Sequence, residues 1–393
     1  MRGLPTSSPL FLNADVLTRP PAGVDHFKLT ILDGAFRLAN IFLRALQGLL
    51  YRPVRDPHKI LIFRTGSLGD SLCALPAIKS IIRSYPHAKV DILTNTGGGG
   101  LAGLNHLLDP NLYSEVIDYS GYTRSQLFWM LKSRRYDLVI QLPQVDAPFL
   151  SLVRDLIFFR WVACSGFGWQ KSQVPFFQKT QFRHLQFKNE VARLKSLLAA
   201  HSIEVAESEK ILEPDPKHLR IARDFLDGCR IDPSRPLVAV VPGAKRPQNR
   251  WPLSHFSALI EKLSVEHAVI LIGSAEDKQF SELLKVHPNV YDACGVFSPL
   301  ESAAMLSLCQ LAISNDTGPM HLSYSVQTPT LAMFSSRDLP GKWYPAISES
   351  AVLRGMRIPC EACFSDTCQN NLCMQTISVD MVYAKAIQML QGR

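Results

Sequence analysis

The sequence has no long hydrophobic run and no excess of acidic charge. It lacks the roughly 18–20 uninterrupted apolar residues of a membrane-spanning helix, although apolar residues make up 47% of the chain. The first thirty residues also lack a compact apolar segment preceded by positive charge, so we expect no signal peptide. These absences exclude a spanning helix and favour a cytoplasmic protein, with attachment to a membrane surface left open.

Acidic residues number 34 against 42 basic ones, which gives a net charge of +8 and a pI near 9.0. A basic balance of this size suggests an anionic partner, which can be a nucleic acid, a phosphorylated ligand or an anionic membrane. At 393 residues the chain is too long for one ordinary domain, so two domains with extensions are expected.

The cysteines do not suggest a disulfide framework. Their number, nine, is odd, and most of them are scattered in apolar stretches. This usage is typical of reduced, buried thiols in a cytosolic protein. Near the C-terminus, however, four cysteines fall within fourteen positions: Cys360, Cys363, Cys368 and Cys373. Their spacing lacks the paired C-x-x-C of zinc ribbons, so metal ligands, redox pairs and free packed thiols all remain open.

Strand and helix patterns alternate twice along the chain. Residues 58–205 contain four expected strands, and a second series with strands at 237–241, 268–272, 290–293, 311–314 and 330–334 follows a proline-rich linker. Alternation of this kind predicts parallel, doubly wound sheets, that is, two Rossmann-like α/β domains. We expect an N-terminal arm and helix over 1–57, a first domain over 58–215, a second over 216–378 and a closing helix over 379–393.

The segment 58–85 joins a buried strand to an amphipathic helix through a glycine loop, and Asp70 lies where the strand gives way to the helix. Ligands bind at this edge of open α/β sheets. The loop has no Walker lysine and does not fit G-x-G-x-x-G, so the first domain is not expected to hold the nucleotide. Asp70 is then either a general base or a helix cap.

Two loops in the second half suit a diphosphate. At 315–321 a strand leads into Asp316, Thr317 and Gly318, and Pro319 takes a first helical position, which leaves free N–H groups at a positive helix end. His321 adds a further donor; the alternative is that Asp316 and Thr317 only cap the helix.

The loop 242–252 supplies cations that can meet phosphate charge, unless it is only an exposed basic loop: Lys245, Arg246 and Arg250. Between these two loops, Glu276 occupies the first turn of a helix that follows the strand at 268–272.

Two segments have the composition of a surface-binding region. Residues 27–51 predict a helix with one polar stripe and a broad apolar face, which either packs on the core or lies in a membrane interface. Residues 151–193 mix cations with aromatic side chains, a mixture that binds nucleic acid or an anionic lipid head group, or else forms an aromatic core with solvated cations.

Taken together, the three loops resemble the heptosyltransferases of glycosyltransferase family 9. The resemblance covers roughly 58–390 and rests on KILIFRTGSLGDSLCALPAI, PGAKRPQNRWP and SNDTGPMHLSYSVQTPTLAMF, with support from FSSRDLPGKWYP and the cysteine cluster. It implies a two-domain GT-B fold and a metal-independent, inverting sugar transfer that needs no cofactor. It also implies that Asp70 deprotonates the acceptor hydroxyl.

The resemblance implies further roles. The donor diphosphate would lie on Asp316, Thr317, Gly318 and His321, with Glu276 as a ribose contact and Lys245 and Arg250 as donor-binding cations. Candidate contacts for the acceptor are Arg64, Arg154, Arg160 and Arg183. One departure concerns the K-x-W-P motif of the family, because Asn249 stands here in place of its lysine.

We therefore expect transfer of a heptose from ADP-L-glycero-D-manno-heptose to the inner core of lipopolysaccharide, by a peripheral protein at the inner face of the cytoplasmic membrane. No nucleic acid partner is expected. The alternatives are a family member with another donor or acceptor, and a non-catalytic module that retains the fold and binds membrane or nucleic acid.

Overall fold

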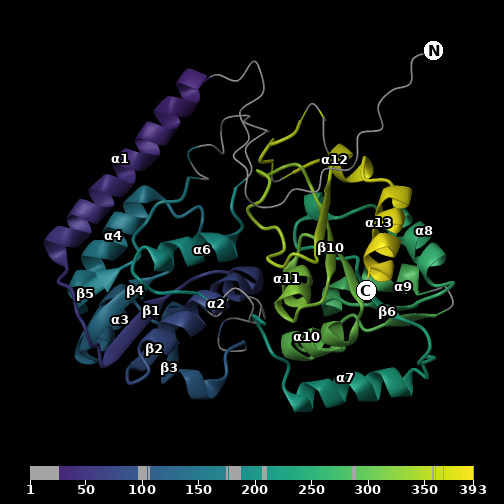
Figure 1. The fold of residues 1–393 in the computed structure, drawn as a ribbon, viewed down its shortest axis with the longest axis horizontal. Coiled ribbons are helices and arrows are strands. Elements are labelled where there is room, and N and C mark those ends of the chain that lie inside the picture. Colours follow the sequence, from purple (N-terminus) through teal and green to yellow (C-terminus); the bar gives the residue numbers. More distant parts are fainter. Residues whose placement is uncertain are drawn as a thin grey trace.

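The computed structural model describes residues 26–95, 104, 107–173, 176, 187–205, 210–285, 289–355, 358, 360–365 and 367–392. Two separate sheets organise these residues, and all of their strand pairs are parallel (Figure 1). The α/β architecture with two parallel-sheet halves is thereby confirmed.

The first sheet has the strand order β3-β2-β1-β4-β5. Its strands are β1 (Lys59–Phe63), β2 (Lys89–Thr94), β3 (Glu115–Asp118), β4 (Tyr136–Gln141) and β5 (Ala163–Phe167). The edge strand β5 was not predicted, because its sequence ACSGF is short and lies inside the stretch interpreted as a basic, aromatic surface.

Helices cover both faces of this sheet. They are α2 (Leu68–Ser84), α3 (Arg124–Ser133), α4 (Phe149–Arg160) and α6 (Glu190–Ala199), with the short turns η2 (Pro110–Leu112) and η3 (Tyr119–Gly121). Strand side chains alternate between faces, so Ile60 and Ile62 pack in the core cluster that holds α2 and α6, whereas Leu61 packs in the cluster that holds α3 and α4.

The second sheet has the order β11-β10-β9-β6-β7-β8. Its strands are β6 (Leu237–Val241), β7 (Ala268–Leu271), β8 (Val290–Asp292), β9 (Leu311–Asn315), β10 (Thr330–Phe334) and β11 (Ala351–Arg354). Strands were predicted at all of these places except β11, a half-buried edge strand whose four residues alternate too briefly to show a pattern.

The helices of this half are α7 (Pro216–Gly228), α8 (Leu253–Leu263), α9 (Lys278–Leu284), α10 (Pro299–Leu308), α11 (Gly318–Ser325), α12 (Leu372–Gln375) and α13 (Val379–Gln391). Two short turns, η4 (Pro247–Asn249) and η5 (Ala275–Asp277), follow β6 and β7. Helix α10 begins with a capping box, since the Ser298 hydroxyl accepts from the Glu301 N–H while the Ser298 N–H donates to the Glu301 carboxylate.

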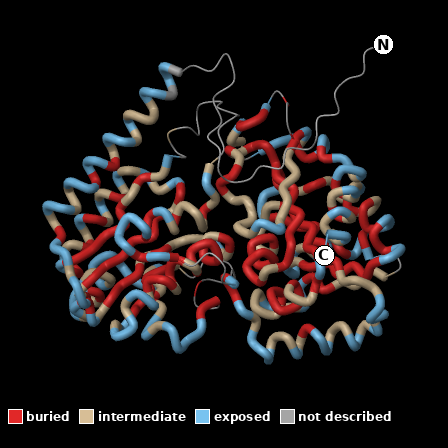
Figure 2. The backbone as a smooth tube through the Cα atoms, in the orientation of Figure 1, coloured by how far each residue is buried: buried red, intermediate tan, exposed pale blue. Residues whose placement is uncertain are grey.

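The two halves meet where α2 of the first packs against α11 of the second, near the centre of the molecule (Figure 1). One apolar cluster includes Leu72 and Leu75 of α2 as well as Met320 and Tyr324 of α11. Figure 2 shows the same central region as buried backbone. The starts of both helices, which carry the candidate residues, are therefore brought together by core packing.

Helix α1 (His26–Leu50) extends along the outside of the first half, next to α4 (Figure 1). One side of the helix is buried at Leu43, so the helix packs on the protein, while Leu38 on another side is 67% exposed; binding of the exposed side to a membrane interface stays a prediction. The expected polar stripe does not face solvent as a unit, since Asn40 is buried and bonded to the backbone of Lys171. Within the described ranges, no helix combines the length and apolarity needed to cross a bilayer.

Candidate active site

Asp70 lies in the first turn of α2, directly after the loop that leaves β1. Its Oδ2 accepts hydrogen bonds of 2.8 Å from both the N–H and the hydroxyl of Ser67, so it forms the capping box of this helix. Gly66 permits this contact, because a Cβ at its position would lie 2.3 Å from the Asp70 Cβ. The Asp70 side chain nevertheless stays 16% exposed, so capping and contact with a ligand are compatible.

A buried ion cluster of Arg64, Glu190 and Arg193 packs against this turn. The Arg64 side chain is fully buried and donates to the carbonyl of Asp70 at 3.0 Å and to the carboxylate of Glu190 at 3.2 Å. Its Nη1 also donates to the carbonyls of Leu142 and Pro143. Such contacts hold the start of α2 in place and keep Arg64, predicted as an acceptor contact, beneath Asp70 with no exposed side-chain surface.

The start of α11 has the features of an anion site. Thr317 is the N-cap in extended conformation, and its hydroxyl makes no capping hydrogen bond. Pro319 takes one of the first helical positions and has no N–H to satisfy. The hydroxyl of Thr317 and the N–H of Gly318 are thus left for a ligand at the positive end of the helix.

His321 connects the two helix starts. A Cβ on Gly69 would lie 2.8 Å from its Cδ2 and 3.1 Å from its Nε2, and a Cβ on Gly318 would lie 3.2 Å from Leu68 of α2. The glycines therefore allow the backbone turns of α2 and α11 to approach closely. Asp70 and Thr317 each lie one residue from a member of this contact, which brings the predicted base and the predicted diphosphate site to the same place.

The other side of the His321 ring is held by hydrogen bonds. Its Nδ1 lies 2.9 Å from the Tyr324 hydroxyl, which in turn lies 3.2 Å from the Cys73 sulfur on α2. Burial lowers the pKa of His321 to about 4, so the imidazole is neutral at pH 7. If the Tyr324 hydroxyl donates to Nδ1, the proton of the neutral ring is on Nε2, the nitrogen that faces Gly69.

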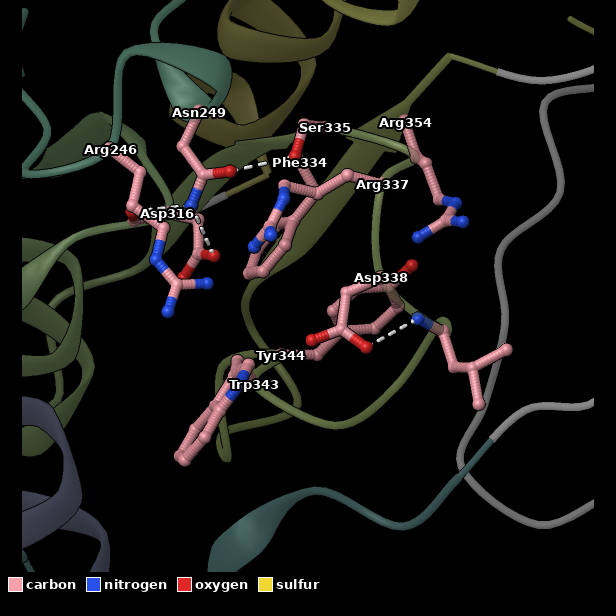
Figure 3. A pocket seen from close by; sticks show the side chains of 11 residues that line it. Arg246, Asn249, Asp316, Phe334, Ser335, Arg337, Asp338, Trp343, Tyr344 and Arg354 are labelled. Atoms are coloured by element: carbon pink, nitrogen blue, oxygen red, sulfur yellow. Dashed lines mark hydrogen bonds between the residues drawn. The ribbon is translucent and has the colours of Figure 1, made fainter. Parts of the chain in front are cut away.

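A pocket opens beside this helix start (Figure 3). In it the Asn249 amide donates to the Asp316 carboxylate at 2.9 Å and accepts from the Ser335 hydroxyl at 2.7 Å. The pocket is lined by residues of four segments: Arg246, Asn249, Asp316, Phe334, Ser335, Arg337, Asp338, Leu339, Trp343, Tyr344 and Arg354.

Asp316 has the most perturbed carboxyl group of the site. Burial raises its pKa to about 7, and the nearby carboxylate of Asp338 adds to this effect. Three nearby cations oppose the rise: Arg246, Lys342 and Arg337. Near neutral pH the protonated carboxyl is therefore populated, and in that form it can donate a hydrogen bond to an anionic ligand.

The other residues predicted to bind the donor, Lys245, Arg250 and Glu276, are not among those that line this pocket. Arg250 donates to the carbonyl of Ala244 and stacks 5.0 Å from the ring of Phe280, whereas Lys245 of the same loop is exposed. Glu276 is exposed in η5. Its neighbour Asp277, which was not singled out, caps that turn and fills the space left by Gly243 and Gly273.

The predicted acceptor cations on α4 lie away from the two helix starts. Arg154 pairs with the adjacent Asp155 and is 65% exposed. Arg160 ends α4 and is half-buried. Arg183 lies outside the described residues.

The C-terminal cysteines carry free thiols, with Cys373 buried and the other three exposed. Burial, helped by the three neighbouring cysteines, raises the pKa of Cys373. Among the residues that the structure describes, no group of three or more His, Cys, Asp or Glu side chains is arranged to hold a metal ion.

Several pocket residues were not predicted as functional: Ser335, Arg337, Asp338, Trp343, Tyr344 and Arg354. Most belong to the segment FSSRDLPGKWYP, which contributed to the resemblance without any role for its members. Its charged and aromatic side chains directly after a predicted strand were the available signal.

Comparison with known proteins gives a family for this arrangement. Residues 124–374 match the family model described as glycosyltransferase family 9 (heptosyltransferase). Lipopolysaccharide heptosyltransferase 3 of Escherichia coli is 24% identical over 286 residues, which span 69% of this chain and 81% of the relative. Lipooligosaccharide heptosyltransferase 2 of Haemophilus influenzae is 22% identical over 313 residues, spanning 75% and 87%.

Solved structures show the same fold. The glycosyl transferase family 9 protein from Veillonella parvula superposes with a TM-score of 0.67 at 19% identity and covers 87% of this chain and 99% of its own. E. coli heptosyltransferase WaaC with ADP-2-deoxy-2-fluoro heptose gives 0.56 at 18% identity, covering 84% and 99%. These likenesses confirm the expected GT-B architecture.

Proposed function

Since this chain belongs to glycosyltransferase family 9, we propose that it transfers a heptose from ADP-L-glycero-D-manno-heptose to the inner core of lipopolysaccharide. The observation that carries the proposal is the contact between the two helix starts, where the Gly69 backbone meets the ring of His321. A candidate base and a candidate diphosphate site lie on either side of this contact. The names of the relatives support heptose as the sugar and lipopolysaccharide as the acceptor.

In the proposed reaction Asp70 accepts the proton of the acceptor hydroxyl, whose oxygen attacks the anomeric carbon of the donor. The bond from that carbon to the diphosphate breaks on the opposite side, so the configuration inverts. A positioned base of this kind contributes about 10²–10⁴-fold to the rate. Arg64 holds the backbone turn that carries Asp70 and acts as a positioning residue.

The departing diphosphate gains negative charge at the start of α11. We assign its stabilisation to the Thr317 hydroxyl, the Gly318 N–H and the Nε2–H of His321, which form fixed dipoles at a positive helix end. The protonated Asp316 adds a donor on the side of the pocket. Lys245 and Arg250 border the same sheet edge, and Glu276 remains the proposed ribose contact.

A second candidate donor is another nucleotide sugar. Asn249 favours this alternative, because it places a neutral amide on Asp316 where the family motif has a lysine. An amide leaves the Asp316 carboxyl without a directly bonded cation, and the pocket then suits a sugar that accepts a hydrogen bond from it.

Isothermal titration calorimetry with ADP, UDP and GDP tests the donor. We expect ADP to bind at least about tenfold more tightly than the other two, which corresponds to about 1.4 kcal/mol. The isosteric variant Thr317→Val should weaken ADP binding, whereas Thr328→Val, which changes a buried threonine three residues after the end of α11, should not. Preferential binding of UDP or GDP would exclude the ADP sugar.

The acceptor is tested by transfer from ADP-heptose to lipopolysaccharide that lacks inner-core heptose, with intact lipopolysaccharide as the control. Heptose should appear only on the deficient acceptor. Tight ADP binding without transfer to this acceptor would favour another acceptor, and the absence of both would favour a non-catalytic role.

A further inference from the structure

Helix α1 presents an apolar surface to solvent on the side opposite to its packing face. The exposed residues recur at intervals of three, four and seven, which is one side of a helix. Their exposed fractions run from 51% for Phe42 to 81% for Leu49. The full stripe consists of Phe27, Ile31, Leu38, Ile41, Phe42 and Leu49.

The opposite side fixes the helix on the first half of the molecule. The Asn40 amide exchanges two hydrogen bonds with the backbone of Lys171. Just after the helix, the Tyr51 ring stacks on Trp169 at 4.7 Å and its hydroxyl donates to the carbonyl of Leu156. The opposite side of α1 is therefore already packed on the first half of the molecule, and the apolar stripe is left on the outside.

Helix α4 continues this surface. Its Phe149 ring lies 5.8 Å from Phe42 of α1. Leu150, Ile157 and Trp161 recur at helical spacing on α4 and are exposed, with Trp161 at 65%. Exposed tryptophan is favoured at the boundary between lipid and water, where its ring is partly apolar and partly polar.

Charge indicates what covers this surface. Helices α1 and α4 together carry five cations, Lys28, Arg37, Arg44, Arg154 and Arg160, against two acids, Asp33 and Asp155. An apolar stripe bordered by cations is complementary to anionic lipid, whose acyl chains take the apolar side chains while the head groups meet the charge.

The surface also adjoins the candidate active site. Leu32 of α1 packs in a small cluster with Leu339, and Leu339 lines the pocket beside Asp316. The loop before α4 contacts the side chain that holds the Asp70 turn, because Arg64 donates to the carbonyl of Pro143. A lipid-linked acceptor held at this surface would lie on the same half of the molecule as Asp70.

We propose that α1 and α4 form a docking surface for an anionic lipid bilayer, with the apolar stripe in the head-group layer and the helix axis parallel to the membrane. This inference rests on the proposed function for the identity of the lipid-linked acceptor, but the surface itself stands on its exposure and charge. It makes the N-terminal helix the element that brings the half with Asp70 to the membrane.

The test is binding of the full-length protein to phosphatidylcholine vesicles with and without about 30% phosphatidylglycerol. Wild type should bind the anionic vesicles much more tightly. The double variant Leu38→Glu/Leu49→Glu should weaken this binding at least tenfold. The control is Leu283→Glu on α9, where a leucine of the other half is also well exposed, at 62%, and it should bind as wild type does.

Two further measurements complete the test. Light scattering reports whether the stripe joins two copies of the chain; a wild-type dimer that the double variant converts to monomer, without vesicle binding, would overturn the proposal. Equal vesicle binding by wild type and double variant would also overturn it.

Transfer assays separate this proposal from the proposed function. The double variant should transfer heptose to a soluble core oligosaccharide at the wild-type rate and lose activity only on acceptor embedded in vesicles. If wild type binds vesicles but transfers heptose to neither acceptor, the proposed function fails while the docking surface stands.

Discussion

Replacing Glu190 by glutamine tests the buried ion cluster under Asp70 without changing the shape of the side chain. The carboxylate lies 3.2 Å from Arg64 and 2.6 Å from Arg193, and the side chains of Glu190 and Arg64 have no exposed surface. Burial by itself would raise the pKa of Glu190, but Arg193 and Arg64 hold it below the ordinary value. The carboxylate is therefore charged in the folded protein.

Removing one partner of a buried ion pair costs about 3–5 kcal/mol, because the remaining charge is left uncompensated. Arg64 keeps its bonds to the carbonyls of Leu142 and Pro143, and the new amide still offers an acceptor, so we expect about 3 kcal/mol. For a cooperative unit of 150–250 residues this corresponds to a fall of about 6–12 °C in the melting temperature.

Differential scanning calorimetry measures this change, and Asp380→Asn is the matched control. That carboxylate pairs with Lys262 at 2.8 Å, but its side chain is 85% exposed, so its loss should cost less than about 1 kcal/mol. A Glu190→Gln melting temperature equal to that of the control would refute the role assigned to the cluster.

The same pair of proteins gives a pH test. Because the folded-state pKa of Glu190 is depressed, its stabilisation is present above the unfolded carboxyl pKa of about 4.3. It is lost as pH falls through the lower folded-state value. The stability difference between wild type and Glu190→Gln should therefore be full at neutral pH and shrink below about pH 4.

Three further predictions concern the site itself. Affinity for ADP-heptose, measured by calorimetry, should fall between about pH 6 and pH 8, because the bound diphosphate raises the pKa of Asp316 above its value of about 7. The fall should be about tenfold for each unit by which that pKa is raised, and Asp316→Asn should show no such fall. Tyr324→Phe should lower kcat/KM by up to about tenfold, because Nδ1 of His321 loses the hydroxyl that fixes its tautomer, a hydrogen bond that contributes about 0.5–1.5 kcal/mol. Gly69→Ala should lower kcat/KM at least tenfold, since its methyl group would lie 2.8 Å from the His321 ring, whereas Gly34→Ala, with open space around it, should leave the rate unchanged.

Each of these predictions has a contrary outcome. Affinity that rises with pH would remove the protonated carboxyl of Asp316 from donor binding. An unchanged kcat/KM in Tyr324→Phe would mean that catalysis does not depend on the bond between this hydroxyl and His321. Equal rates for the two glycine variants would mean that the close approach of α2 and α11 is not needed for catalysis.

The sequence predicts those parts of the structure in which pattern and packing agree. Continuous apolar strands such as 237–241 appear where they were expected, because local propensity and burial favour the same conformation there. The short edge strands β5 and β11 have too few alternating residues to show a period.

Site residues that belong to a sequence motif could be predicted. Contacts between residues far apart in the sequence could not. Asp70 and Thr317 follow strands and precede helices, so their neighbourhood in an α/β protein can be expected. By contrast, the burial of Arg64 against Glu190 joins positions 126 residues apart, and the bond between Asn249 and Asp316 joins positions 67 apart. A cation in a loop looks the same in sequence whether it lies under the site or faces a ligand.

The direct test of the proposed mechanism is the initial rate of heptose transfer by Asp70→Asn. The amide keeps an acceptor for the N–H of Ser67, so the helix cap and the melting temperature should be retained. We predict a rate about 10²–10⁴-fold below wild type with unchanged ADP affinity. A folded Asp70→Asn protein that transfers heptose at the wild-type rate would contradict the assignment of Asp70 as the base.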